Sequence, residues 1–269
     1  MKNWGLFRYG PSCILALIWY DAPMRILFLD TETTDIGPGS RLVQLAYKNG
    51  LTGEEVSAYF KPPVVISYGS MAVHHITNEM VADKPVFAGS EYQARLVVLL
   101  SETICVAHNA PFDIGILKNE GVEISTYIDT LRVARHLIVS DQHNLQYLRY
   151  SLHLNTIEVR AHDAMGDVLV LEALFAHLAG LVREKFSCAS DDEIVSKMLE
   201  LTYAPVPMTT FAFGKYKGKT FDEVRAMDRG YITWLHTSEK QKPVSEQNED
   251  LMYTLGLCIQ GKLGTPTLL

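Results

Sequence analysis

Cysteine is scarce in this 269-residue sequence, and its positions do not suit zinc. There is no Cys-x-x-Cys pair among Cys13, Cys105, Cys188 and Cys258, which lie far apart. Zinc modules and disulfide-rich secreted domains both need regularly spaced cysteines, so both classes are disfavoured. We therefore expect reduced, mostly buried thiols in a cytoplasmic protein.

Positive charge is also in short supply, with 24 Lys and Arg against 31 Asp and Glu. A domain that binds nucleic acid through phosphate contacts alone is usually basic, so the net charge of −7 argues against that class. It does not argue against a site in which clustered carboxylates hold cations. Internal repeats and low-complexity tracts are absent, and 48% apolar residues suffice for a packed core.

The apolar run near the N-terminus is short. Residues 13–20 follow Lys2 and Arg8, as in a signal peptide, but Asp21-Ala22-Pro23 is a poor cleavage junction. The run is also too short to span a bilayer. We favour an extension over residues 1–23, of the kind an upstream start codon would add, with the folded part beginning at Met24. N-terminal cleavage near Ala22 would support the signal-peptide alternative.

Strand patterns open the folded part. Arg25–Asp30 is short and apolar, and Arg41–Lys48 and Glu55–Phe60 are further strand candidates. Asn49-Gly50 is a dipeptide typical of a tight hairpin. The sequence therefore predicts three antiparallel strands at the start of the domain.

Strands and helices then alternate. The expected strands are Thr103–Ala107 and Ile124–Ile128, and the expected helices are Glu91–Glu102, Pro111–Asn119, Asp129–Ile138, Asn144–Leu152, Asp163–Leu181 and Asp191–Leu201. This order predicts an α/β domain over residues 24–204, with a mixed five-stranded sheet flanked by helices. Pro205-Val206-Pro207 suits a linker, and residues 208–262 would form a small C-terminal domain.

Asp30 and Glu32 lie two residues apart at the end of the first strand, which places both on one face. Neighbouring carboxylates repel each other, and a cation between them relieves the repulsion. Hard oxygen ligands suit Mg²⁺ or Mn²⁺. Taken alone, the pair fits a surface turn equally well.

Three further residues add to this pattern. Asp113 falls in the first turn of a helix, where it could simply oppose the helix dipole. Asp167 and the leucines four, seven and eleven positions later share one helix face, and a carboxylate on such a buried face is costly unless paired or metal-bound. His162 precedes Asp167 by five residues, and it could be an ordinary surface histidine.

Taken together, the set resembles the DEDD exonuclease superfamily. Asp30 and Glu32 match its first motif, Asp113 its second and Asp167 its third. His162 marks the histidine-bearing branch, since the tyrosine of the other branch would stand at Asp163. Family members often carry arginine at that position, so Asp163 could alter phosphate contacts.

Longer segments within Arg25–Ile259 resemble the exodeoxyribonuclease X family: Met71–Thr77, Met80–Pro85, Met208–Lys219 and Gly230–Leu235. The resemblance implies an RNase H-like fold and a 3′→5′ exonuclease that releases nucleoside 5′-monophosphates from single-stranded or duplex DNA ends, in DNA repair. It also implies two Mg²⁺ or Mn²⁺ ions, with Asp30 bridging them and Glu32, Asp113 and Asp167 completing the ligands. His162 would be the general base.

The resemblance extends to substrate contacts. Ile36 would wedge against the last base and His74 would touch it, and Thr31, Thr33 and Asn109 would also line the substrate site. A buried loop residue is the alternative for Ile36.

The C-terminal stretch is locally basic. Residues 208–242 hold seven Lys or Arg against four Asp or Glu, and Lys215, Lys217 and Lys219 alternate as on one face of a strand. With aromatic residues nearby, this indicates a nucleic-acid contact surface. A solvated basic face over an aromatic core is the alternative.

Two other functions compete with the DNA exonuclease. An RNA-trimming or proofreading-type exonuclease would use the same site, although the C-terminal segments favour DNA repair by resemblance. A non-catalytic binding module is the third, and the intact set of Asp30, Glu32, Asp113, His162 and Asp167 weighs against it.

Overall fold

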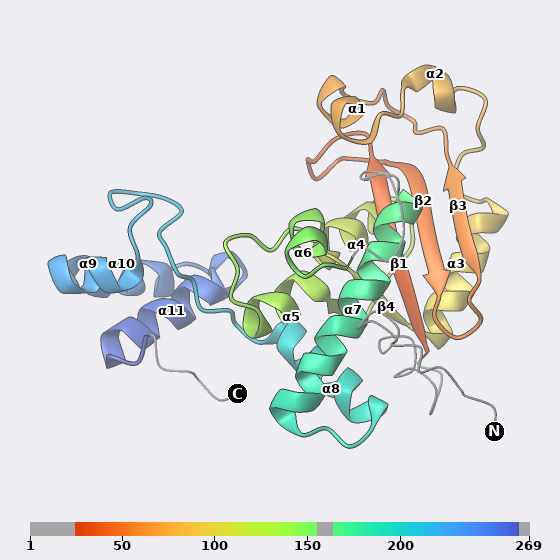
Figure 1. The fold of residues 1–269 in the computed structure, drawn as a ribbon. Coiled ribbons are helices and arrows are strands. Elements are labelled where there is room, and N and C mark those ends of the chain that lie inside the picture. The colour runs from red at the N-terminus through yellow and green to blue at the C-terminus, as the bar shows by residue number, and fades with distance from the viewer. Residues whose placement is uncertain (1–24, 155–163, 264–269) are drawn as a thin grey trace, which may run out of the picture. The chain divides into compact units, whose positions relative to one another are not determined.

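The computed structural model describes residues 25–154 and 164–263, which form two compact units divided between Thr202 and Tyr203 (Figure 1). The N-terminal extension, His162 and Asp163 lie outside the described residues. Each unit has its own apolar core.

The first unit contains a five-stranded mixed sheet in the order β3-β2-β1-β4-β5 (Figure 1). β1 (Ile26–Thr33), β2 (Leu42–Asn49) and β3 (Glu55–Tyr59) are antiparallel, as predicted. β4 (Ile104–Ala107) runs parallel to β1, and β5 (Tyr127–Asp129) runs parallel to β4. β1 therefore lies at the centre of the sheet, between β2 and β4.

The connection between β2 and β3 differs from the prediction. β2 continues through Asn49, and residues 50–54 form a wider turn than the two-residue Asn-Gly hairpin. The Asn49 side-chain oxygen accepts the N–H groups of Leu51 and Thr52, at 2.9 and 3.2 Å. Gly53, with φ of 74°, takes the left-handed conformation that closes the turn. The asparagine thus stabilises a longer loop.

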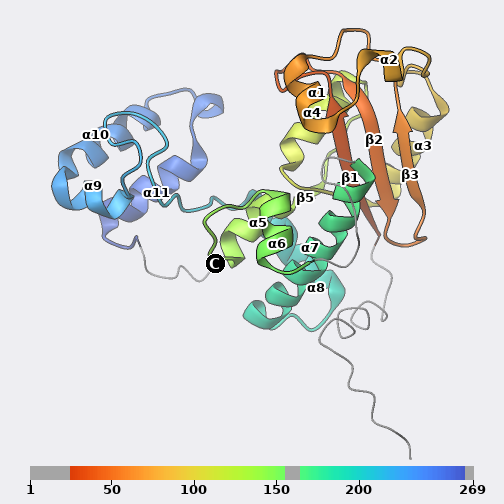
Figure 2. The ribbon, with the colours of Figure 1, turned by 45° about the horizontal axis from the view of Figure 1, so that its top comes forward.

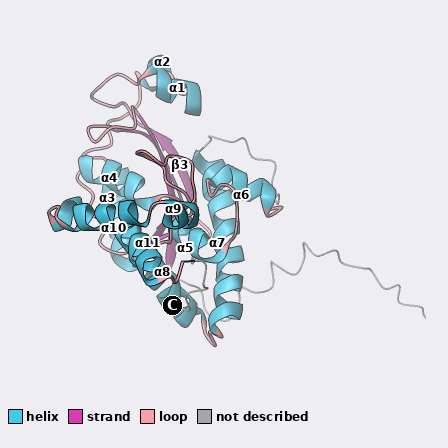
Figure 3. Ribbon diagram, turned by 90° about the vertical axis from the view of Figure 1, so that its left-hand side faces the viewer, coloured by secondary structure: helices cyan, strands magenta, loops and turns pink. Residues whose placement is uncertain are grey.

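Helices cover both faces of the sheet (Figure 3). α7 (Ala164–Phe186) packs on one face together with α5 (Thr130–Leu137) and α6 (Leu145–Ser151). α3 (Glu91–Glu102) and α4 (Ala110–Asn119) pack on the other. This arrangement follows the pleat of β1, whose successive side chains point to opposite faces.

The alternation along β1 separates the two cores. Ile26 and Phe28 join the core of α7, whereas Leu27 and Leu29 join that of α3 and α4. The predicted leucine stripe of α7 is buried in the first of these cores. α7 is long and apolar enough to cross a membrane, but its apolar residues are largely those buried against the sheet, as in the core helix of a globular domain.

Three shorter or peripheral helices complete the first unit. α1 (Tyr68–His74) and α2 (Asn78–Val81) follow the sheet's antiparallel part and lie beyond one end of its strands (Figure 2). The N–H of Ser67, the cap of α1, donates to the carbonyl of Thr34 just after β1, at 2.9 Å. α8 (Asp191–Tyr203) packs beside α7. Short helices thus border the point where β1 ends.

The second unit is helical, with α9 (Phe221–Met227), α10 (Arg229–Lys240) and α11 (Glu249–Gln260) and a short 3-10 turn at Val244–Glu246. Its core is aromatic, with the rings of Phe211 and Phe221 stacked 4.0 Å apart. The proline segment packs onto this unit, where the buried Val206 donates its N–H to Asp250 at 2.8 Å.

The lysine-rich segment does not form the strand that its alternating lysines predicted. Residues 213–219 form consecutive turns, so Lys215, Lys217 and Lys219 do not alternate along a strand. Gly214 and Gly218, with φ of 70° and 86°, reverse the chain there, and only a single bridge pairs Thr210 with Thr220. The glycines override the alternating pattern.

Candidate active site

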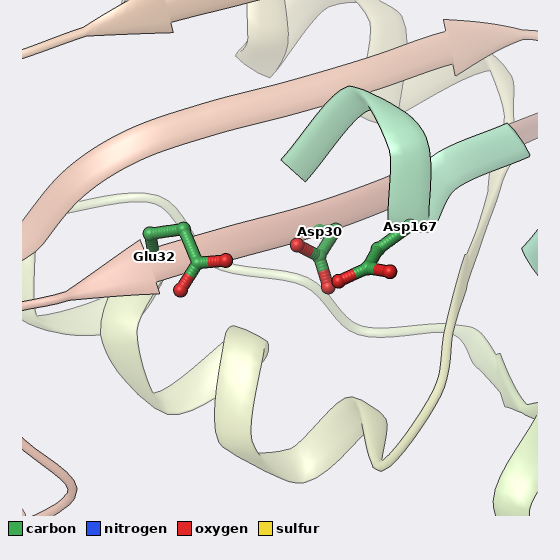
Figure 4. A group of neighbouring side chains, drawn as sticks. All are labelled: Asp30, Glu32 and Asp167. Atoms are coloured by element: carbon green, nitrogen blue, oxygen red, sulfur yellow. The ribbon is translucent and has the colours of Figure 1, made fainter. Parts of the chain in front are cut away.

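Three carboxylates converge in the first unit. One ligand oxygen each from Asp30, Glu32 and Asp167 lie within 4.8 Å of one another (Figure 4). Asp30 and Glu32 are half-buried and Asp167 is buried. A set of oxygen donors alone at this spacing fits a hard divalent cation, since such ions take carboxylate oxygens as ligands.

The fold explains why these three side chains meet. Asp30 and Glu32 continue the even-numbered face of β1, the face on which Ile26 and Phe28 pack against α7. Asp167 lies in the first turn of α7, on its buried stripe. The strand and the helix therefore deliver their carboxylates to one place, and Figure 4 shows those of Asp30 and Asp167 facing each other.

Asp113 does not belong to this group of three. It lies in the first turn of α4, on the other face of the sheet, and its Oδ1 accepts two hydrogen bonds from Thr31. The Thr31 N–H lies at 3.0 Å and its hydroxyl at 2.7 Å. Burial raises the pKa of the Asp113 carboxyl to about 7, although the hydrogen bonds from Thr31 oppose that shift. Thr31 thus links Asp113 to the strand that carries Asp30 and Glu32.

Gln146 is a functional candidate that sequence reasoning missed. Its side-chain N–H donates to Oδ1 of Asp167, and its own oxygen accepts from Arg149 at 3.3 Å. Gln146 stands in α6, whose predicted cap Asn144 accepts the N–H of Tyr147 at 2.9 Å. The cap was readable from the sequence. The partner of Gln146 was not, because it lies 21 residues away on another helix.

The loop after β1 is held by hydrogen bonds among its own residues, and one apolar side chain projects from it. The Thr33 hydroxyl donates to the Asp35 carbonyl at 2.7 Å, and Asp35 accepts the N–H of Ile36 at 2.8 Å. The Ile36 side chain is 85% exposed. The alternative of a buried loop residue therefore does not hold for Ile36.

His74 is buried under this loop. Its Nδ1 accepts the N–H of Ile76 at 3.0 Å, so Nε2 carries the proton and donates to the Thr33 carbonyl at 3.1 Å. The ring therefore fixes the end of β1. The contact of His74 with the terminal base, which the family resemblance implies, stays a prediction.

Asn109 lies between β4 and α4 in a left-handed conformation, with φ of 69° and its side chain exposed. Its N–H donates to the buried Asp129 at 2.9 Å, and Asp129 also accepts the N–H of Leu131. Asp129 thereby holds together the turns that follow β4 and β5. Its burial was not foreseen from the sequence.

Lys215 and Lys217 belong to the second unit, where both are exposed. Nζ of Lys215 lies 3.3 Å from Asp228 and 4.7 Å above the Tyr216 ring. His162, the proposed base, lies outside the described residues.

Comparison with known proteins agrees with this arrangement. The family described as Exonuclease matches residues 27–175, and the family described as Exodeoxyribonuclease X-like C-terminal matches residues 211–236. The chain belongs to the exonuclease family, which confirms the predicted family and its RNase H-like fold.

Within this family the chain is similar to exodeoxyribonuclease 10 of Escherichia coli strain K12. The two are 31% identical over 220 residues, which cover 77% of this chain and 88% of that protein. DNA polymerase III subunit epsilon of Buchnera aphidicola subsp. Acyrthosiphon pisum is 30% identical over 175 residues, covering 58% and 73%. A solved structure of exonuclease X in complex with 5′ overhanging duplex DNA gives a TM-score of 0.48 at 26% identity, covering 66% of this chain and 99% of that one.

Proposed function

We propose that this chain is a 3′→5′ exodeoxyribonuclease that releases nucleoside 5′-monophosphates from DNA 3′ ends, and that it acts in DNA repair in the cytoplasm. The observation that carries the proposal is the convergence of Asp30, Glu32 and Asp167 in a chain of the exonuclease family. The similarity to exodeoxyribonuclease 10 extends over 88% of that protein and favours DNA as the substrate.

The second unit favours a stand-alone exonuclease over a proofreading-type subunit. The match to the DNA polymerase III epsilon relative covers only 58% of this chain. The match described as Exodeoxyribonuclease X-like C-terminal falls within the second unit, at residues 211–236. A stand-alone DNA exonuclease accounts for both parts of the chain.

The proposed cofactor is a pair of Mg²⁺ or Mn²⁺ ions held by Asp30, Glu32, Asp113 and Asp167. When bound, such ions activate water and stabilise the charge that develops on phosphate and the leaving 3′-oxygen. Asp113 is linked to β1 by the two hydrogen bonds from Thr31, and in this proposal it would supply the fourth carboxylate of the site. Gln146 holds Asp167 in place through its side-chain amide.

The remaining roles are assigned to the chain's own side chains. His162 would take the proton of the attacking water, since an imidazole titrates near neutral pH. Ile36 would stack against the terminal base, because its exposed side chain projects from the loop that follows the strand of Asp30 and Glu32. Thr33, His74 and Asn109 would shape the nucleotide site, with His74 acting through its hydrogen bond to Thr33.

Product analysis tests the proposed activity. DNA and RNA labelled at the 3′ end are incubated with Mg²⁺ or Mn²⁺, and the released products are separated. We expect labelled deoxynucleoside 5′-monophosphate from DNA, and none with Asp30→Ala. Faster release from RNA would favour the exoribonuclease alternative. Activity that survives Asp30→Ala would refute the assigned site.

His162→Ala tests the assignment of the base. We expect kcat to fall by roughly 10²- to 10⁴-fold, the usual contribution of a positioned base, with DNA binding largely intact. Steady-state kinetics and a binding titration in the presence of Ca²⁺ measure the two effects separately. His153→Ala is a matched control, since this other histidine is exposed and precedes the same stretch of chain. Unchanged turnover in His162→Ala would remove His162 from this role.

A further inference from the structure

The second unit carries an exposed aromatic surface that its fold does not need. Trp234 is 60% exposed and Phe213 is 40% exposed, although apolar burial is the main source of stability in a unit of this size. On α10 the buried stripe consists of Ile232, Leu235 and Glu239, and Trp234 lies outside that stripe. Full burial of an indole would stabilise the unit further, so its exposure points to another use.

The exposed rings belong to one continuous aromatic cluster. Tyr231 and Trp234 have ring centroids 5.5 Å apart, and Tyr231 meets Tyr216 edge-on at 4.9 Å. Tyr231 also contacts the lysine turn, because a Cβ on Gly214 would lie 3.0 Å from its hydroxyl oxygen. Gly214 therefore allows residues 213–219 to pack against the aromatic face of α10. Phe213 joins the cluster through the buried Phe211, whose ring lies 6.4 Å from that of Phe213 and 6.0 Å from that of Tyr231. We name Phe213, Tyr231 and Trp234 the aromatic platform.

Positive charge borders the platform. Lys215, Lys217 and Lys219 are all exposed within the turn that Gly214 and Gly218 shape, and no acidic residue interrupts residues 211–221. Nζ of Lys215 is held 4.7 Å above the ring of Tyr216, whose hydroxyl donates to Asp228 at 2.7 Å. One cation, Lys215, is therefore held over an aromatic face and paired with Asp228, and two further lysines lie exposed on the same turn of an acidic chain.

We propose that the aromatic platform and the lysine turn bind single-stranded DNA, with bases stacked on Trp234 and Phe213 and phosphates contacted by Lys215, Lys217 and Lys219. Stacking needs unpaired bases, and the lysines complement a phosphate backbone, so a single strand uses both features. A duplex presents its phosphates but hides the faces of its bases. The inference rests on the proposed exodeoxyribonuclease function and assigns the second unit the task of retaining the strand.

Binding to an oligodeoxythymidylate by the full-length chain tests the proposal, with Asp30→Asn present in every protein so that the strand stays intact. We expect Trp234→Ala to weaken binding roughly 5- to 150-fold, the usual effect of losing one stacked base. Trp234→Phe keeps a ring and should bind nearly as the parent does. Quenching of tryptophan emission by the oligonucleotide should be lost in Trp234→Phe. Val244→Ala, at an 86% exposed position of the same unit, is the apolar control.

The lysines are tested through salt dependence. Each phosphate contact on a single strand contributes about −0.7 to the slope of log K against log salt, so Lys215→Ala/Lys217→Ala should make it shallower by about 1.4. Lys118→Ala is the matched control, because its side chain is 66% exposed against 65% for Lys215. The proposal is overturned if Trp234→Ala leaves the affinity unchanged and the lysine variant leaves the salt slope unchanged. It is also overturned if the control variants lose as much affinity or slope as these variants do. Equal dependence of blunt duplex binding on Trp234 would also overturn it.

A small substrate separates this inference from the proposed function. Hydrolysis of thymidine 5′-monophosphate p-nitrophenyl ester needs the carboxylate site but no strand. In the otherwise unmodified chain, Trp234→Ala should leave its turnover unchanged while raising KM for a long single strand by a similar 5- to 150-fold. Absence of turnover on both substrates by the unmodified chain refutes the proposed function. Normal turnover with an unchanged KM in Trp234→Ala refutes only the strand-binding surface.

Discussion

At the scale of single residues, the hydrogen bonds of Thr31 to Asp113 join the central strand β1 to the start of α4. Both donors of Thr31 point to one carboxylate oxygen, and both groups are buried. Asp30 and Glu32, which flank Thr31 on β1, point to the opposite face of the sheet. The position of Asp113 therefore depends on a residue that is not itself a carboxylate.

Thr31→Val removes the hydroxyl and keeps the shape of the side chain. We expect the free energy of unfolding to fall by about 1–3 kcal/mol, because a buried carboxyl loses one donor. We also expect the pKa of Asp113 to rise further, since the Thr31 hydrogen bonds hold it down. Urea unfolding and NMR titration of the carboxyl measure these effects, with Thr31→Ser as the control that retains the hydroxyl. A valine variant as stable as the parent would contradict this role for the hydroxyl.

His108, at the end of β4, predicts a dependence of stability on pH. Burial lowers the pKa of its imidazole, and the hydrogen bond to the His143 carbonyl opposes that shift only partly. The unfolded chain takes up a proton near pH 6.5 whereas the folded chain stays neutral, so this contribution is present above pH 6.5 and is lost below it. Chemical unfolding at pH 7.5 and 5.5 should show a smaller difference for His108→Gln than for the parent. An identical difference would show that His108 stays charged or exposed in the fold.

At the scale of elements, the loop from Thr34 to Arg41 positions Ile36. The N–H of Thr34 donates to the Arg41 carbonyl and that of Arg41 to the Thr34 hydroxyl, both at 2.9 Å. Arg41 in turn forms an ion pair with the buried Glu120 of the α4 end at 2.8 Å. The loop is thus closed at its base, and its tip carries the exposed isoleucine.

Ile36→Ala should slow digestion of duplex ends and leave single strands nearly unaffected, because only a duplex needs its last pair separated. The comparison is kcat/KM on blunt and single-stranded DNA of the same sequence. Leu51→Ala, an exposed apolar position in the turn between β2 and β3, is a suitable control. Equal losses on both substrates would assign Ile36 to general binding instead.

Elements with a local signal were predictable. Ser90 accepts the N–H of Gln93 at the start of α3, and that helix has the predicted bounds. α9 was missed although Thr220 and Glu223 form a capping box, because the lysines nearby suggested a strand. The same alternation hid the effect of Gly214 and Gly218. Capping residues therefore mark where helices begin, and glycines with positive φ override an alternating pattern that would otherwise indicate a strand.

At the scale of the whole molecule, the site joins the central strand to the longest helix. The meeting of Asp30 and Glu32 with Asp167 could be inferred from strand and helix periodicity together with the family resemblance. The separation of Asp113 from that group could not, because it depends on which face of β1 the helix α4 covers. Long-range partners such as Gln146 and Asp167 leave no periodic trace in a single sequence.

Divalent metal should stabilise the whole chain. A ligand bound only by the folded state raises stability by about 2.7 kcal/mol at one hundred times its Kd. We expect Mg²⁺ or Mn²⁺ to raise the Tm, EDTA to reverse the rise, and Asp30→Asn to reduce it. Glu246→Gln, an acidic exposed position of the second unit, should keep the full rise. A rise of equal size in Asp30→Asn would place the ion elsewhere.

The pleat of β1 also sets where this enzyme can be redesigned. Leu27 and Leu29 pack in one core and Ile26 and Phe28 in the other. Inserting one residue in the strand would turn every residue after the insertion to the opposite face, and it would move Asp30 and Glu32 away from Asp167. Residues 35–39 lie outside the strand and are exposed. A library that aims to change end preference while retaining catalysis should therefore vary this loop and leave the strand unaltered.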